Sequence, residues 1–78
     1  MLYRLFLFDD LRRVIDIVEF TFNNDVAAID KARRFLRLGA WQMWQDDRLV
    51  MHRWPDHWAE ADREAFLARR PPLSNAVA

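Results

Sequence analysis

The absence of cysteine is the strongest constraint on how this 78-residue chain can fold. Domains of this size bury only about 60% of their unfolded surface, and many need a disulfide or a metal ion to be stable. This chain has neither disulfides nor thiolate metal sites, and its two histidines are too few for a structural zinc site without carboxylates. Stability must therefore come from six Phe, four Trp and one Tyr, since burying one large apolar side chain contributes roughly 1.5–3 kcal/mol. These aromatic residues predict a small core or an oligomer interface.

Short apolar runs predict two β-hairpins. The four predicted strands are Leu2–Phe8, Val14–Phe22, Ala40–Gln45 and Arg48–Trp54. The polar-biased segment Asp9–Arg12 is predicted to form the first hairpin loop, and Asp46-Asp47 the second turn. Pro55 ends the last strand because proline cannot donate a hydrogen bond to a sheet.

A helix follows the first hairpin. Asn23-Asn24-Asp25 offers N-cap residues, and the helix is predicted to run to about Leu38, with Gly39 as its C′ residue. Its apolar stripe comprises Val26, Ile29, Ala32 and Leu36, widened by Ala28 and Phe35.

A second helix is predicted from Asp56 to Arg70, where Pro71-Pro72 end it. Its thin apolar stripe comprises Trp58, Ala61 and Ala65, with Phe66 at its margin. The predicted fold is therefore α+β in the order β-β-α-β-β-α: a four-stranded antiparallel sheet with one helix on a face and a second, C-terminal helix. Residues 1–70 form the single domain, and residues 71–78 are expected to be a disordered tail.

Three segments of the chain resemble those of a group of small, uncharacterised bacterial proteins with a β-β-α-β-β arrangement. They are the strand Tyr3–Phe8, the helix opening Asn24–Ile29 and the hairpin Met43–Val50, which carries the pattern Trp-Gln-x-x-Arg at Trp44 to Arg48. The resemblance covers roughly the first fifty residues, and the segment Trp54–Ala78 departs from it. It implies the fold and carries no assigned activity.

The charge balance limits the function classes. Twelve basic and twelve acidic residues give zero net charge, which argues against a protein that binds polyanions by bulk attraction. No stretch approaches the roughly 18 apolar residues of a membrane span. Met1–Phe8 is too short, and too soon followed by Asp9-Asp10, to be a signal peptide, so a cytoplasmic protein without membrane association is expected.

No arrangement of residues predicts catalysis, a metal site or a cofactor. His52 and His57 are five residues apart, on a strand and at a helix start, so they do not share one helix face. The paired carboxylates Asp9-Asp10 and Asp46-Asp47 lie in predicted turns, where turn geometry explains them. A single glycine in the chain rules out a phosphate-binding loop. The sequence therefore predicts a protein that is not an enzyme.

The sheet face opposite the first helix is the predicted protein interface. Strand alternation places on it Gln42, Trp44, His52 and Trp54. Aromatic and polar side chains together are typical of interface cores. The sequence leaves an alternative open, in which the second helix folds back over this face and Trp58 and Phe66 join Trp44 and Trp54 in a second core.

These observations predict a non-enzymatic protein–protein interaction module, an inhibitor or adaptor that occupies a partner surface and can form a homodimer. The identity of the protein partner is not predicted. The alternative is a nucleic-acid-associated protein that uses a basic helix face formed by Arg33, Arg34 and Arg37. A third possibility is a small ligand-binding fold with a pocket between the sheet and the second helix.

Overall fold

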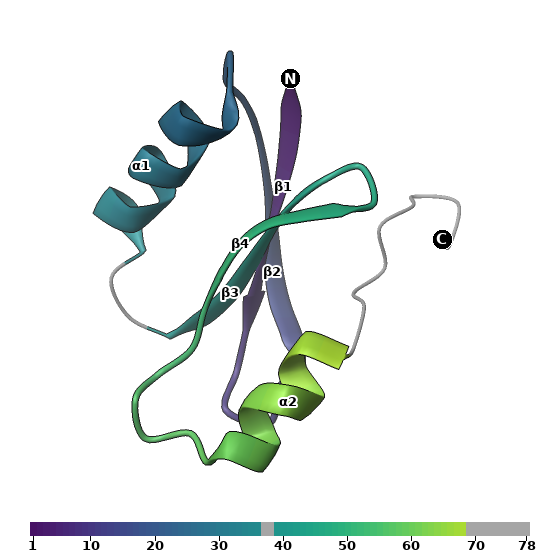
Figure 1. Cartoon of the computed structure of the whole chain (residues 1–78), viewed down its shortest axis with the longest axis vertical. Coiled ribbons are helices and arrows are strands. Elements are labelled where there is room, and N and C mark those ends of the chain that lie inside the picture. Colours follow the sequence, from purple (N-terminus) through teal and green to yellow (C-terminus); the bar gives the residue numbers. More distant parts are fainter. Residues whose placement is uncertain (37–38, 69–78) are drawn as a thin grey trace.

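The computed structural model describes residues 1–36 and 39–68 (Figure 1). Its elements are β1 (Leu2–Phe8), β2 (Val14–Thr21), α1 (Asp25–Phe35), β3 (Ala40–Gln45), β4 (Arg48–Arg53) and α2 (Glu60–Ala68). This order and the single antiparallel sheet confirm the predicted α+β fold. Neither described helix has the length and apolarity that crossing a membrane requires. Residues 71–78, predicted to be a tail, lie outside the described residues.

The sheet has the strand order β2-β1-β3-β4, so the two N-terminal strands of the hairpins lie side by side at its centre. β1 pairs with β2 from Leu2↔Thr21 to Phe8↔Val14, and with β3 from Arg4↔Trp44 to Phe8↔Ala40. Both pairings are antiparallel. Consequently β2 and β4 are the edge strands.

Aspartates shape both hairpin turns in the absence of glycine. The Asp9 carboxylate accepts hydrogen bonds from the backbone N–H groups of Leu11 and Arg13, each at 2.9 Å. These bonds hold the pKa of Asp9 below its ordinary value, and the bond from the Arg13 N–H has the largest effect. Arg12 and Asp46 adopt left-handed φ angles of 62° and 55°, a conformation that a tight turn requires and that aspartate tolerates better than most residues.

α1 begins as predicted and ends earlier. The Asn24 side chain caps it by accepting the Ala27 N–H at 2.9 Å. The helix ends at Phe35 rather than near Leu38, and Gly39 (φ 83°) immediately precedes β3 instead of serving as the C′ residue. The Trp41 indole N–H donates to the Leu36 carbonyl at 3.1 Å, which ties the helix end to β3 and satisfies a carbonyl that the ended helix leaves free.

The first core cluster lies between α1 and the sheet. Its buried members are Tyr3, Leu5, Ala28, Ala32, Trp41 and Met43. Val26, placed on the apolar stripe by the sequence, is instead 77% exposed. The two buried alanines let the helix approach the sheet closely, and the helix phase that buries them turns Val26 toward solvent.

The second core cluster lies on the opposite face, beneath α2. Its buried members are Phe6, Phe8, Ala40, Trp44, Trp58 and Phe66. The Phe66 ring meets Phe8 and Trp58 edge to face, with centroids 4.8 and 5.3 Å apart. Of the two arrangements that the sequence left open, the structure therefore has the one in which the second helix covers this face.

α2 differs from its prediction in length and in the face it buries. It begins at Glu60 rather than Asp56, because the chain after Pro55 forms a turn in which the Trp58 N–H donates to the Pro55 carbonyl at 3.1 Å. Ala61 and Ala65 are exposed, and Phe66 is the buried residue of the helix. One large aromatic side chain sets the helix phase and turns the alanines outward.

Gln42 joins α2 to the sheet from a fully buried position. Its Nε2 donates to the Phe66 carbonyl at 3.0 Å, and its Oε1 accepts the Trp44 indole N–H at 2.9 Å. A buried polar group is costly unless its hydrogen bonds are made, and here both ends of the amide are engaged.

We expect Gln42→Leu to lower the free energy of unfolding by about 2 kcal/mol or more, because the variant leaves the Phe66 carbonyl and the Trp44 indole N–H without the amide. Urea denaturation followed by Trp fluorescence measures the change. Gln45→Leu is the matched control: Gln45 is only half-buried and its Oε1 bonds Arg48 at the surface, so its loss should cost less than about 1 kcal/mol. Equal effects of the two variants would contradict the bridging role of Gln42.

Asp25 joins α1 to both hairpins and makes the stability of the fold depend on pH. Its carboxylate accepts hydrogen bonds from Arg48, at 2.8 and 3.0 Å, and from the Tyr3 hydroxyl at 2.7 Å. These bonds lower the pKa of Asp25 from 3.8 to about 2, and those from Arg48 have the largest effect. A carboxyl whose pKa is lower in the folded state stabilises the fold above its unfolded pKa, and that contribution is lost as the pH falls through the folded pKa.

We therefore expect Asp25→Asn to be less stable than the wild type at neutral pH, and the difference to shrink as the pH falls from 3.8 to about 2. Denaturation at a series of pH values gives the comparison. Asp30→Asn is the control, since Asp30 forms only an exposed pair with Arg34 on α1 and should change stability little at any pH. A difference between wild type and Asp25→Asn that stays constant down to pH 2 would be inconsistent with this assignment.

Candidate interaction surface

The interface predicted from the sequence is mostly internal. Gln42 and Trp44 are 1% and 5% exposed, while His52 and Trp54 are half-buried at the margin of the same face. The His52 and Trp54 rings lie 4.8 Å apart, and burial lowers the pKa of His52. The Arg63 guanidinium lies 5.5 Å from the Trp54 ring and holds α2 against this margin. A partner that used Gln42 and Trp44 would first have to displace α2.

The apolar surface that stays open is β2. Five consecutive residues of this strand, Ile15–Glu19, are exposed. Three of them are β-branched and apolar: Ile15 is 63%, Ile17 48% and Val18 42% exposed. No other strand in the described part of the chain has such a run. Neither helix covers the exposed run: α1 packs against the sheet beside Phe20, and α2 lies over the aromatic cluster on the opposite face.

The outer edge of β2 carries unpaired backbone groups. Met1 and Phe22 exchange both of their backbone hydrogen bonds, at 2.8 and 3.0 Å. Such hydrogen-bonded pairs recur at every second residue of an antiparallel ladder. The backbone N–H and C=O groups of Phe20, Val18 and Asp16 therefore point toward β1. Those of Ile17, Glu19 and Thr21 point outward, away from the sheet. In the described residues no strand pairs with this edge.

One of these outward N–H groups already has a partner within its own strand. The Asp16 carboxylate accepts a hydrogen bond from the Ile17 N–H at 2.8 Å. A charged side chain at this position is typical of edge strands that avoid indiscriminate pairing. Glu19, on the other face, forms an ion pair with Arg4 at 2.8 Å and is thereby neutralised.

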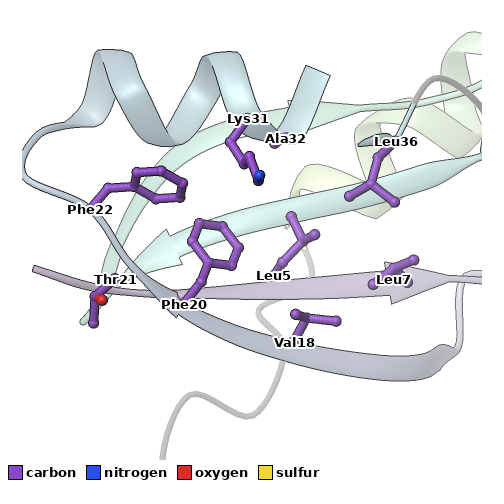
Figure 2. Close-up of a pocket in the computed structure, with 9 residues that line it drawn as sticks. All are labelled: Leu5, Leu7, Val18, Phe20, Thr21, Phe22, Lys31, Ala32 and Leu36. Carbon is purple, nitrogen blue, oxygen red and sulfur yellow. The ribbon is translucent and has the colours of Figure 1, made fainter. Parts of the chain in front are cut away.

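An apolar groove runs between the β2 side of the sheet and α1 (Figure 2). Its volume is about 380 Å³, within the range of small ligand or side-chain pockets. It is lined by Leu5, Leu7, Val18, Phe20, Thr21, Phe22, Lys31, Ala32 and Leu36. Figure 2 shows Lys31 reaching from α1 toward the cavity, where it is the one charged residue among the described residues of the lining. The small, buried Ala32 belongs both to the first core cluster and to the α1 wall of the groove.

The basic helix face predicted for nucleic acid is less positive than its residue types suggest. Arg34 pairs with Asp30 at 3.2 Å on the solvent side of α1. Arg33 is exposed near Arg53, whose guanidinium donates to the Gly39 carbonyl. Arg37 lies outside the described residues.

The described residues bring together no metal-binding group of three or more His, Asp or Glu side chains. His52 is on β4, and His57 is exposed in the turn before α2, where its Nε2 lies 3.8 Å from an Asp10 carboxylate oxygen. Asp46 and Asp47 form the exposed turn of the second hairpin.

Comparison with protein-family models, with curated proteins and with solved structures yields no match. The resemblance to small bacterial β-β-α-β-β proteins therefore stays a prediction.

The sequence contained a partial signal for this surface. The alternation of Val18, Phe20 and Phe22 correctly places them on one face. Ile15 and Ile17 lie on the opposite face of the same strand and are also apolar, so the strand is apolar on both faces. A strand that is apolar on both faces is typical of a central position in a sheet, yet here it lies at the edge.

We expect an apolar fluorescent dye such as anilinonaphthalene sulfonate to bind the folded protein in the groove. Val18→Lys should weaken binding several-fold, because it replaces an apolar wall with a charge. Val26→Lys, at a more exposed valine remote from the groove lining, is the control and should leave the dye affinity unchanged. Both variants should unfold within about 0.5 kcal/mol of the wild type, since both sites are exposed. Equal dye affinity in all three proteins would show that the groove is not the binding site.

Proposed function

We propose that this protein is a non-enzymatic interaction module that occupies the surface of a partner protein through the outer edge of β2 and the adjoining groove. The observation that carries the proposal is the exposed run Ile15–Glu19, which combines apolar side chains with outward backbone groups. Exposed apolar patches on small proteins commonly mark binding sites, and an open sheet edge is a template for an added strand.

Strand addition suits this surface better than flat packing does. Main-chain hydrogen bonds to Ile17, Glu19 and Thr21 would provide affinity without regard to side chains. Specificity would come from the alternation of the added strand, since every second side chain falls on the groove side, next to Val18 and Phe20. One extended segment of a partner could therefore contact the backbone edge of β2 and the groove beside it at the same time.

Nucleic-acid association through Arg33, Arg34 and Arg37 is the less favoured proposal. The ion pair between Arg34 and Asp30 offsets one of the cations, and the net charge of the chain is zero. Phosphate binding depends on an excess of positive charge that can release counterions.

Position-specific photo-crosslinking in the source cell tests the proposed function. A benzoylphenylalanine at Thr21, on the outward edge, is expected to crosslink a discrete protein species, whereas the same residue at Val26 should not. Adding Val18→Lys should remove the Thr21 crosslink, because it disrupts the groove side of the same edge. Crosslinks that are absent at Thr21, or equally strong at Val26, would overturn the assignment of β2 as the binding surface.

A further inference from the structure

We infer that one partner of this edge is a second copy of the chain, joined by antiparallel pairing of β2 with β2 about a two-fold axis centred on Val18. The inference rests on the proposed function, because it uses the same strand. Zero net charge removes the general repulsion between identical chains that would oppose such an association.

The backbone pattern leaves few registers for this pairing. Outward-facing residues must lie opposite outward-facing residues, so the axis passes through a residue and not between two. The residues near the middle of the free edge of β2 are Ile17, Val18 and Glu19. An axis at Glu19 sets two glutamates directly opposite each other, which is destabilising. An axis at Ile17 limits the pairing to residues 16–18, because the bulge between the pairs Leu7↔Asp16 and Phe8↔Val14 lies at Ile15.

The axis at Val18 sets no like charges directly opposite and gives a longer pairing that stays clear of the bulge. It pairs residues 16–20 of both copies, with Val18 opposite Val18 and Ile17 opposite Glu19. The two Glu19 side chains become diagonal neighbours, and the ion pair that each forms with Arg4 of its own chain offsets their repulsion. The exposed side chains of Ile17 and Val18 would be covered on the two faces of the continuous sheet.

The same register is complementary in charge on the groove side. It places Asp16 of one copy opposite Phe20 of the other, on the face from which Lys31 reaches toward the cavity (Figure 2). Pairing takes the Ile17 N–H away from the Asp16 carboxylate, and the ammonium group beside the groove offers that carboxylate a new partner. The two Val18 side chains would also close the open side of the groove.

Single cysteines test the register, because the chain has none of its own. In this pairing Val18 faces its counterpart in a non-hydrogen-bonded pair, with Cα atoms about 4.5 Å apart, within the range of a disulfide. We expect Val18→Cys to oxidise to a covalent dimer of twice the 9.4 kDa chain mass. Ile17→Cys is offset by two positions from its counterpart and should link poorly. Val26→Cys, which is more exposed, controls for linking by collision. Preferential linking at Ile17, or equal linking at Val26, would overturn the register.

Sedimentation equilibrium of the unmodified chain tests association itself. The apparent mass should rise with concentration from 9.4 kDa toward twice that value, and Val18→Lys should weaken association about tenfold or more by facing two ammonium groups across the axis. A constant mass of 9.4 kDa up to millimolar concentration would overturn the inference. If the benzoylphenylalanine at Thr21 still crosslinks a different protein in that case, the proposed function stands. Only the inference that a second copy of the chain is a partner would then be wrong.

Discussion

The pairing of β1 with β3 is the contact on which the remaining structure depends. It joins two hairpins that are separated in sequence by α1 into one sheet, with Leu5 opposite Met43 and Phe6 opposite Gln42. Side chains from these two strands supply most of both core clusters. A hairpin alone is only marginally stable in water, so neither half of the sheet would persist without this central ladder. The same pairing makes β2 an edge strand.

The two faces of the sheet are covered by different means. α1 approaches through two alanines and leaves a groove beside β2, whereas α2 is held by one phenylalanine, a tryptophan in the preceding turn and the buried amide of Gln42. Aromatic side chains on the α2 side fill space that so short a helix could not fill with aliphatic residues. The eleven aromatic residues of the chain thus replace the staples that its composition excludes.

Much of the fold follows from local sequence, because strands, turns and the N-cap are local events. The bounds of β1, the Asp46-Asp47 turn and the Asn24 cap agree with their patterns. The errors arose where tertiary contacts decide. The Trp41 bond to Leu36 accompanies the early end of α1, and Phe66 rather than the alanines sets the phase of α2. The candidate surface was missed for the same reason: strand order, which makes β2 an edge, is a long-range property that periodicity does not encode.

The unlike character of the two sheet edges has a consequence for the growth of assemblies. β2 presents an apolar edge, whereas β4 is half-buried along its interior and begins and ends with arginine. A contact between two identical edges uses up both of them and closes, but a contact between unlike edges leaves one of each exposed and propagates into fibres. Because β4 is a poor match for β2, the proposed pairing of β2 with β2 would close at two copies and would not propagate.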